Sequence, residues 1–208
     1  MDPDTAMFLQ INDLARATGW LHPLVVAYAS YGVAVFAVLM LAGWWIARRR
    51  ASVAAMAAAL WAPVGVLLAV GVNQPIVGLV GEPRPYTLYP DMLVLAQHSL
   101  DPSFPSDHAV MAGSVTAGVW LVSRRLGLAS TLAAVVMAFS RVYIAAHYPH
   151  DVLAGLLLGA AVSIVGYLLA RGMLTRLITV LETSVARPLL TCAPPVPVQP
   201  AVNHSMVR

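Results

Sequence analysis

Residues 52–80 read SVAAMAAALWAPVGVLLAVGVNQPIVGLV and contain no aspartate, glutamate, lysine or arginine. A helix of this length can cross the hydrocarbon core of a bilayer, which requires about 20 helical residues. Pro63 and Pro75 interrupt the hydrogen-bond ladder of the helix, and Asn73 adds a polar group, so we expect a kinked or tilted helix. This stretch indicates an integral membrane protein.

The rest of the chain has a similar composition. Of its 208 residues, 60% are hydrophobic and 10% are charged, whereas a soluble domain carries about 25% charged residues. The length accommodates one membrane domain, residues 1–187, without an appended soluble module. The net charge is +3 and the basic residues, all arginines, lie in small groups between apolar runs. This pattern does not indicate nucleic-acid binding. The single cysteine, Cys192, excludes an intrachain disulfide.

Five apolar runs are predicted to span the membrane, and together they predict an all-α bundle of about five transmembrane helices. They are residues 24–47, 52–80, 106–123, 126–146 and 152–170. The third run is short. It reaches a crossing length only if its first turn includes Ser106, Asp107 and His108, which places these polar residues at the membrane surface.

Two further segments flank these spans. Residues 5–18 place apolar side chains on one helical stripe, which predicts an amphipathic helix on the outer membrane surface. The stripe consists of Met7, Phe8, Ile11, Leu14 and Ala15. Residues 188–208 contain five prolines and little apolar periodicity, so we expect a disordered cytoplasmic tail.

The arginines predict the orientation of the chain. With five spans, eight of them fall on one side of the membrane: Arg48, Arg49, Arg50, Arg124, Arg125, Arg171, Arg176 and Arg187. The other side has only Arg16 and Arg84, with Arg141 near its rim. The positive-inside rule then places the C-terminus in the cytoplasm and the N-terminus outside. We expect a multi-pass protein of the plasma (inner) membrane.

Three polar clusters fall at the outer face in this topology. They are Glu82-Pro83-Arg84-Pro85, Pro105-Ser106-Asp107-His108, and Ser140-Arg141 followed by His147 and Asp151. Phosphoryl transfer needs fixed positive charge, a nucleophile and an acid for the leaving group. Arg84 and Arg141 can make forked bonds to phosphate oxygens. The coincidence of the clusters at one face therefore predicts an extracytoplasmic phosphate site.

The positions of the other polar residues suggest their roles. Ser106, Asp107 and His108 open a helix, whose N-terminus favours an anion. Asp107 is either an ordinary capping residue or a carboxylate that favours the protonated form of His108. Arg141 and His147 can converge only if their helix breaks near residue 146, which the nearby Pro149 favours. Asp151 can then bond one nitrogen of His147 and leave the other free for attack.

These motifs resemble the type-2 phosphatidic acid phosphatase superfamily. That family has a lysine seven residues before an Arg-Pro pair, then Pro-Ser-Gly-His, then Ser-Arg followed by a histidine and an aspartate at the spacings found here. The chain departs from this pattern at Val77, the lysine position, and at Asp107, the glycine position. In both departures, in Glu82 and in the stretch from Ser103 to His108, the sequence resembles the bacitracin-resistance-type undecaprenyl diphosphatases.

The resemblance implies a membrane lipid phosphatase. Its reaction would hydrolyse undecaprenyl diphosphate to undecaprenyl phosphate through a phosphohistidine at the outer face, recycling the cell-wall lipid carrier. The implied roles are His147 as nucleophile, Asp151 as its orienting group, His108 as acid, Arg84, Arg141, Ser106 and Asp107 as phosphate ligands, and Glu82 as an additional member of the site.

Several alternatives stay open at this point. Phosphatidic acid or phosphatidylglycerophosphate would undergo the same chemistry, and a transporter or binding-only membrane protein is the non-enzymatic alternative. Charges gathered at one rim, without an internal repeat, argue against transport. We expect no cofactor and no metal, because arginines beside the histidines repel a cation. The partners are the lipid substrate and membrane lipid, and the oligomeric state is open. Residues 86–100 form either a flap that guides the lipid tail or a plain loop.

Overall fold

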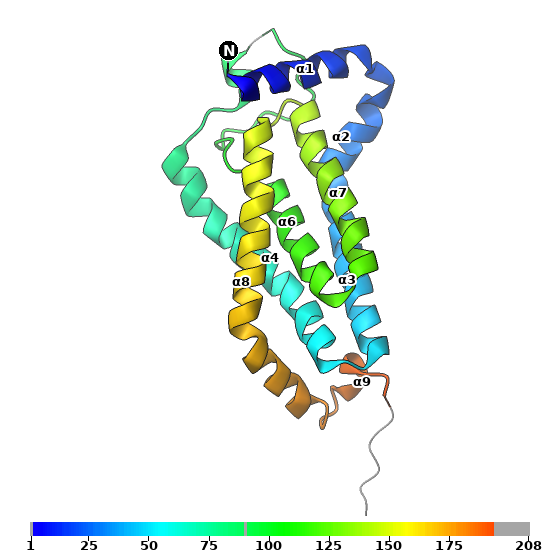
Figure 1. Cartoon of the computed structure of the whole chain (residues 1–208). Helices are drawn as coiled ribbons and strands as arrows, with labels where there is room; N and C mark the ends of the chain where they lie inside the picture. Colours follow the sequence, from blue (N-terminus) through cyan, green and yellow to red (C-terminus); the bar gives the residue numbers. More distant parts are fainter. Residues whose placement is uncertain (1, 90, 194–208) are drawn as a thin grey trace, which may run out of the picture.

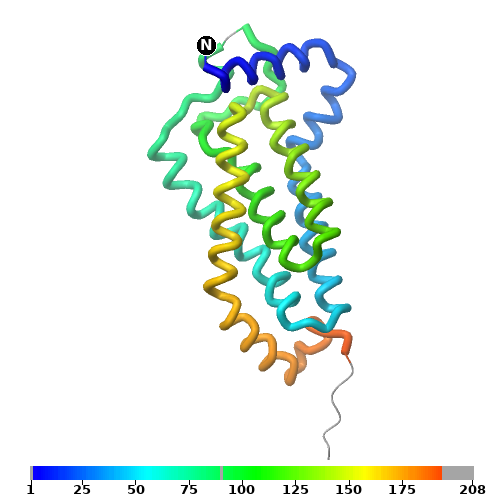
Figure 2. Tube along the Cα trace, in the orientation of Figure 1, coloured from blue at the N-terminus to red at the C-terminus, as the bar shows by residue number. Residues whose placement is uncertain are grey.

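The computed structural model describes residues 2–89 and 91–193, in which every regular element is a helix. In Figure 1, α1 lies across one end of a helical bundle and α9 lies at the other end; Figure 2 follows the same path. This arrangement confirms the predicted all-α membrane bundle with an N-terminal surface helix. The elements are α1 (Pro3–Ala17), the 3-10 turn η1 (Gly19–Leu21), α2 (His22–Tyr31), α3 (Val33–Arg50), α4 (Val53–Val80), α5 (Pro85–Leu88), α6 (Asp107–Val122), α7 (Arg124–Tyr143), α8 (Pro149–Leu181) and α9 (Arg187–Leu190).

Helix α6 occupies the middle of the bundle and packs closely on α8. A Cβ atom on Gly159 would lie 2.0 Å from the carbonyl oxygen of Val110, and one on Gly155 would lie 2.8 Å from that of Ser106. Because no side chain fits at either position, the two backbones come into direct contact. The Ser106 N–H consequently donates to the Asp151 carbonyl at 3.2 Å, so the predicted site residues at the two helix starts are neighbours.

Fewer helices are long and apolar enough to cross a membrane than the five apolar runs predicted from the sequence. In the described part of the chain α4, α7 and α8 are long and apolar enough to cross, and α2 with α3 gives a fourth crossing if that pair is one span. The pair is bent by 56°, so the predicted run 24–47 is broken at Gly32. Helix α6 has 16 residues and is about 24 Å long, which is less than the roughly 30 Å hydrocarbon core. The count of five spans stays a prediction.

The ends of several elements also differ from the sequence-based bounds. Helix α4 continues through both of its prolines and runs obliquely across the bundle in Figure 1. Helix α7 ends at Tyr143, three residues before the predicted position, and α8 continues to Leu181 instead of residue 170.

The predicted tail begins later than expected. The Leu190 side chain is buried in an apolar cluster with Ala47 and Ile178. The indole N–H of Trp44 donates to the Leu189 carbonyl at 3.0 Å. The prediction of disorder is therefore wrong for residues 188–193, because this segment finds apolar and hydrogen-bonding partners on α3 and α8. Its remainder, 194–208, lies outside the described residues.

Helix α1 has nearly the predicted bounds, but its apolar stripe is divided. Phe8 and Ala15 are fully buried, whereas Met7 and Leu14 are 48% and 45% exposed. The buried Asn12 uses both ends of its amide on the backbone of residue 93, at 2.7 and 3.1 Å. Apolar and polar contacts thus attach helix α1 to the rest of the protein. Only part of its apolar stripe is left to face a membrane.

Candidate active site

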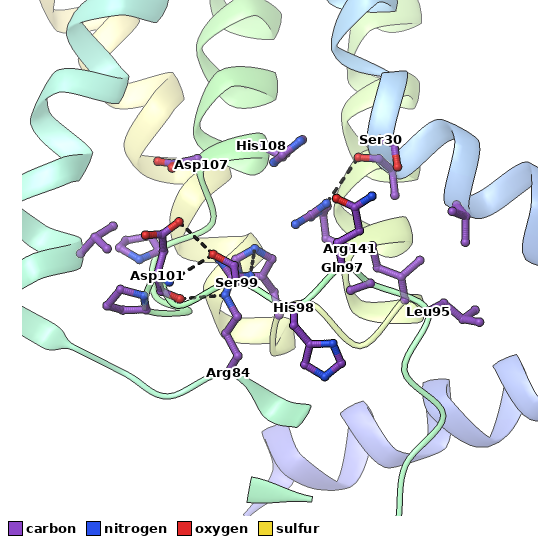
Figure 3. A pocket seen from close by; sticks show the side chains of 18 of the residues that line it. Ser30, Arg84, Leu95, Gln97, His98, Ser99, Asp101, Asp107, His108 and Arg141 are labelled. Carbon is purple, nitrogen blue, oxygen red and sulfur yellow. Dashed lines mark hydrogen bonds between the residues drawn. The ribbon is translucent and has the colours of Figure 1, made fainter. Parts of the chain in front are cut away.

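A cavity of about 570 Å³ opens at the end of the bundle covered by α1. Of the residues predicted to form the site, Arg84, Asp107, His108, Arg141 and His147 line it. They come from the loop after α4, the start of α6, the end of α7 and the turn before α8. Figure 3 labels Arg84, Asp107, His108 and Arg141 among them and shows these side chains gathered with those of the 95–101 segment. The fold therefore brings together most of the predicted site.

Arg84 connects two loops at the wall of this cavity. Helix α4 ends at Gly81, whose φ of 61° is the left-handed conformation that glycine adopts without strain. Beyond this turn, Arg84 donates through Nε to the Asp101 carbonyl at 2.8 Å and through Nη1 to the Ala146 carbonyl at 3.0 Å. The same Nη1 lies 3.3 Å from Nε2 of His147. The guanidinium is thus fixed beside the imidazole.

The turn between α7 and α8 supplies the break that the sequence requires. Helix α7 ends at Tyr143, and Ala145 adopts a left-handed φ of 63°. This conformation costs about 1–2 kcal/mol for a residue other than glycine, and Ala145 is fully buried within the turn. Because the chain reverses here, Arg141 and His147 line the same cavity instead of facing different sides of one helix.

The hydrogen bonds of His147 determine which ring nitrogen is free. Its Nδ1 lies 2.8 Å from the Ser103 carbonyl oxygen and 3.4 Å from Oδ2 of Asp151, and both are acceptors. Nδ1 therefore carries the proton, which leaves the lone pair on Nε2. Burial lowers the pKa of His147, and Arg141 and Arg84 lower it further, although the hydrogen bond to Asp151 opposes these effects. The neutral imidazole is the favoured form.

Asp151 is fully buried in the first turn of α8. Its Oδ2 accepts the backbone N–H of Tyr148 at 2.9 Å and the hydroxyl hydrogen of Ser103. The Ser103 carbonyl lies closer to His147 than the carboxylate does, so Ser103 shares the orienting role assigned to Asp151. Sequence reasoning did not single out Ser103, because its only signal was membership of the phrase 103–108.

Asp107 and His108 are adjacent in sequence but face different surroundings. Oδ1 of Asp107 accepts hydrogen bonds from Nδ2 of Asn73 at 2.7 Å and Nε2 of Gln74 at 3.1 Å. In Figure 3 the two side chains point to opposite sides of the start of α6. The expected effect of Asp107 on His108 is therefore not supported by the geometry, because two amides of α4 hold the carboxylate on the other side.

Ser106 differs from its predicted position at the phosphate site. It is fully buried, does not line the cavity, and its N–H is already bonded to the Asp151 carbonyl. Its hydroxyl has no hydrogen-bond partner among the described residues. The first N–H of α6 with a backbone partner is that of Val110, which donates to the Ser106 carbonyl, so the N–H groups of Asp107, His108 and Ala109 remain for an anion.

Arg141 keeps most of its hydrogen-bonding capacity. One Nη1 bond of 3.4 Å reaches the Ala29 carbonyl, and the buried Nε has no partner among residues 2–89 and 91–193. This guanidinium lines the cavity with Arg84, His108 and His147, while Asp101 and Asp107 also belong to the lining. The arrangement can bind a phosphate group against an unprotonated imidazole nitrogen.

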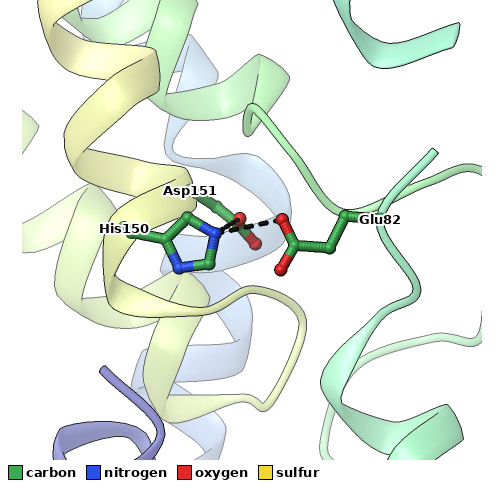
Figure 4. A group of neighbouring side chains, drawn as sticks. All are labelled: Glu82, His150 and Asp151. Carbon is green, nitrogen blue, oxygen red and sulfur yellow. Dashed lines mark hydrogen bonds and ion pairs between the residues drawn. The ribbon is translucent and has the colours of Figure 1, made fainter. Parts of the chain in front are cut away.

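Glu82 lies outside the cavity lining. Its Oε2 is 3.0 Å from Nε2 of His150, which is also 3.1 Å from Oδ1 of Asp151. These three residues, shown in Figure 4, are the one group in the described chain whose ligand atoms are spaced to hold a metal ion. Sequence reasoning placed Glu82 with the phosphate site and gave His150 no role.

The described parts of the 86–100 segment, residues 86–89 and 91–100, are held by hydrogen bonds beside the cavity, and residues 95–99 line it. The Tyr86 hydroxyl accepts the Ser99 N–H at 2.9 Å and donates to the Ser99 carbonyl at 3.1 Å. The Leu95 N–H donates to the Ile144 carbonyl at 3.2 Å. These bonds join two parts of the segment to each other and fix residues 95–99 against the α7–α8 turn.

Comparison with known proteins gives a consistent result. A family model described as "PAP2 superfamily" matches residues 58–173. The bacitracin transport permease protein BcrC of Bacillus licheniformis is 30% identical over 152 residues, which are 73% of this chain and 73% of that protein. The undecaprenyl-diphosphatase BcrC of Bacillus subtilis is 27% identical over 165 residues, which are 79% of this chain and 81% of that protein.

A solved structure supports the same fold. The transmembrane PAP2-type phosphatidylglycerolphosphate phosphatase of Bacillus subtilis superposes with a TM-score of 0.55 at 20% identity. The match covers 79% of this chain and 85% of that one. At this identity the likeness concerns the arrangement of the helices and not the substrate.

Proposed function

The chain belongs to the PAP2 superfamily, and from this premise we propose that it hydrolyses undecaprenyl diphosphate to undecaprenyl phosphate through a phosphohistidine intermediate. The observation that carries this proposal is the environment of His147. Its Nδ1 faces the Ser103 carbonyl and the Asp151 carboxylate, and its Nε2 lies at a cavity that Arg84, Arg141 and His108 also line. A nucleophile, fixed positive charge and an acid are thus available together.

In the first step Nε2 of His147 attacks the terminal phosphorus. The bond from phosphorus to the leaving oxygen breaks, its electron pair goes to that oxygen, and the imidazolium of His108 donates a proton there. The anionic substrate itself favours this protonated form of His108. The Ser103 carbonyl and Asp151 stabilise the charge that develops on the His147 ring. Arg84 exchanges its contact with Nε2 for a phosphate oxygen.

In the second step a water molecule attacks the phosphorus of phosphohistidine. The bond between phosphorus and Nε2 of His147 breaks, and the electron pair returns to the imidazole. His108, now neutral, accepts a proton from the water. Inorganic phosphate leaves, and both histidines regain their starting protonation states.

The choice of substrate rests on two considerations. The Bacillus subtilis relative that covers 79% of this chain is named an undecaprenyl-diphosphatase. The cavity also has an apolar wall, formed by Val26, Val77, Leu95 and Ile144, beside the basic one, which suits a phosphorylated lipid. The Bacillus licheniformis relative is named a transport permease. Hydrolysis requires a nucleophile and fixed positive charge, whereas the transport of a molecule across the membrane does not, so the residues of this cavity favour hydrolysis.

We place the cavity at the outer face of the plasma membrane and the C-terminus in the cytoplasm. Eight arginines, among them Arg48–Arg50 and Arg124–Arg125, lie in segments at the end of the bundle opposite the cavity. The positive-inside rule assigns that end to the cytoplasm. At the outer face the enzyme would act on lipid diphosphates released there and recycle the cell-wall lipid carrier.

The proposal is tested by phosphate release from purified protein. We expect a higher kcat/KM for undecaprenyl diphosphate than for phosphatidylglycerophosphate or phosphatidic acid. Radioactive phosphate trapped on the protein by a denaturing alkaline quench should be base-stable and should be released by acid. If a phospholipid is preferred, the proposed substrate is wrong, but the proposed reaction chemistry still holds. Absence of release from all three would exclude the enzymatic function.

A further inference from the structure

Beside the cavity, His150 lies among three carboxylates from three parts of the chain. Its Nδ1 is 2.7 Å from Oδ2 of Asp4 on α1. Its Nε2 is 3.0 Å from Oε2 of Glu82, after α4, and 3.1 Å from Oδ1 of Asp151, as Figure 4 shows. The other oxygen of Asp4 accepts the His150 backbone N–H at 2.8 Å. No step of the phosphoryl transfer above uses His150.

The surroundings of His150 indicate that its ring is an imidazolium. Ionised carboxylates only accept hydrogen bonds, so both ring nitrogens must donate. The rings of Phe104 and Tyr148 stack on the imidazole with centroids at 5.5 and 5.7 Å and interplanar angles of 28° and 16°. Aromatic faces favour a cation stacked on them. The residue is thus a fixed positive charge among negative ones.

This charge acts on one side of the buried Asp151 carboxylate. Oδ2 faces the reacting side, where Ser103, Tyr148 and His147 contact it. Oδ1 has no aligned hydrogen bond among the described residues, and His150 is the cation that faces it. Without His150 this buried oxygen would lose its compensating charge, and the carboxylate would tend to rotate toward other donors.

Helix α1 holds His150 by polar and apolar contacts. Asp4 binds both the backbone and the ring of His150. One turn further along α1, the fully buried Phe8 packs on Tyr148 with ring centroids 5.4 Å apart. The contacts of α1 therefore reach Asp151 through a single intermediate residue.

We propose that His150 is a positioning residue through which helix α1 fixes the orientation of Asp151 toward His147. Helix α1 is then a working part of the site as well as a surface element. This inference rests on the proposed function, because it assumes that Asp151 and His147 act in the reaction.

The same ligand atoms also lie within 4.8 Å of one another, a spacing that suits a divalent cation between Glu82, His150 and Asp151. A cation would need the lone pair of Nε2 and hence a neutral His150 ring. The two aromatic rings stacked with the imidazole favour the imidazolium instead. Metal content is therefore an outcome of the test.

The first comparison is Asp4→Asn with Asp13→Asn, a matched change at an exposed position of the same helix. A misplaced catalytic group costs rate more than binding, so we expect Asp4→Asn to lower kcat about tenfold with KM unchanged. Asp13→Asn should behave like the natural protein. Purified detergent-solubilised protein and undecaprenyl diphosphate are used throughout, and size-exclusion profiles verify folding.

The pH profile separates positioning from a structural role. The titratable groups that face His150 are Asp4 on α1, Glu82 in the loop, Asp151 on α8 and the stacked Tyr148. Removing the Asp4 charge weakens the imidazolium, so kcat in Asp4→Asn should start to fall at a lower alkaline pH. A change that only loosened the fold would lower kcat without moving this limb.

A charge-rescue pair completes the test. His150→Arg keeps a planar cation that can donate to carboxylates and stack on aromatic rings, whereas His150→Gln is neutral. We expect His150→Arg to retain more kcat than His150→Gln and to lack the alkaline loss attributed to His150. Equal activity in the two variants would contradict a role for the charge.

Further results would overturn the inference or the proposed function on which it rests. The first is that Asp4→Asn and His150→Gln both keep the kcat and the pH profile of the natural protein. If His147→Ala is inactive at the same time, the proposed function stands and only the positioning role of His150 is wrong. Stoichiometric zinc or manganese in the purified protein, lost in Glu82→Gln, would make the cluster a cation site. Full activity of His147→Ala would instead remove the proposed function itself.

Discussion

The two ends of the bundle use arginine in different ways. At the end opposite the cavity, Arg50 donates to the Val122 carbonyl at 2.8 Å, and Arg48 and Arg49 lie 5.5 and 5.0 Å from the Trp45 ring. These are contacts of an interfacial anchor. At the cavity end, Nε of Arg141 has no hydrogen-bond partner in the described part of the chain, and the side chain lines the cavity with His108 and His147. The difference shows that the role of an arginine depends on what its guanidinium faces.

The acidic residues divide the ends even more sharply. Of the nine in the chain, only Glu182 belongs to the arginine-rich end. The others belong to α1, the 81–106 loop and the starts of α6 and α8: Asp2, Asp4, Asp13, Glu82, Asp91, Asp101, Asp107 and Asp151. Charges of both signs allow the cavity end to orient histidines, whereas a surplus of one sign suits only attachment to an anionic surface.

The largest expected effect is at His147. We predict that His147→Ala lowers kcat by at least about 10⁴-fold, because the attacking nitrogen is lost. The control is His22→Gln, at the same end of the molecule, whose native ring contacts the Ala15 carbonyl at 2.8 Å and does not line the cavity. Phosphate release is measured for both variants. Near-normal turnover by His147→Ala would show that the mechanism is wrong.

The second prediction compares one arginine from each end. Arg141→Ala should lower kcat/KM by about 10²- to 10³-fold, because a charged donor to the transferring phosphoryl group is lost. Arg125→Ala, at the exposed start of α7, should change kcat/KM by less than about twofold. Equal losses of activity in the two variants would show that the arginines of the two ends do not differ in their contribution to the reaction.

The sidedness of the two ends is tested by thiol labelling. In a Cys192→Ala background, Thr87→Cys on the exposed surface of α5 should react with a membrane-impermeant reagent in intact cells or spheroplasts. Native Cys192, exposed at the arginine-rich end, should react only after the membrane is opened. The reverse pattern would overturn the orientation and the role in lipid-carrier recycling, and would leave the chemistry intact.

A smaller effect concerns pH. Burial holds the pKa of His147 below its ordinary value, which is about 6.5. The reactive neutral form therefore persists as pH falls through that value, and kcat/KM should decline only at lower pH. Measuring a diphosphate and a monoester substrate separates this limb from substrate ionisation. A limb common to both substrates at or above the ordinary value would contradict the burial effect.

The smallest expected effect is that of chelation. The two carboxylates of the cavity lining are bonded to other groups, Asp107 to the amides of Asn73 and Gln74 and Asp101 to the Ser99 hydroxyl. Two arginines also line the cavity, so EDTA should change the activity of purified enzyme by less than about twofold. Complete loss with EDTA, restored by a divalent ion, would refute a metal-free reaction.

Much of the fold could be predicted because hydrophobicity in a membrane chain is a local property. The apolar runs and the amphipathic segment 5–18 became helices near their expected positions, while the bend at Gly32, the length of α8 and the packing of 188–193 did not follow from the runs. In those places contacts between distant segments decide where an element ends. Leu190, for example, is ordered by residues of α3 and α8.

The predicted site shows the same division. Arg84, His108, Arg141 and His147 could be named from residue type, spacing and resemblance. Neither the amides that turn Asp107 away, nor the Ser103 carbonyl beside His147, nor the displacement of Glu82 to His150 could be read from the chain. Each depends on which of several chemically similar groups comes within hydrogen-bonding distance.

The sequence by itself determined that this is an α-helical membrane protein with a basic, histidine-containing cluster, because burial in lipid requires long apolar helices and leaves the few charges conspicuous. Only the tertiary structure decided that Nε2 of His147 is the free nitrogen and that α1 reaches Asp151 through His150. Hydrogen bonds depend on separations of tenths of an ångström, and such separations are fixed by the packing of helices far apart in the chain.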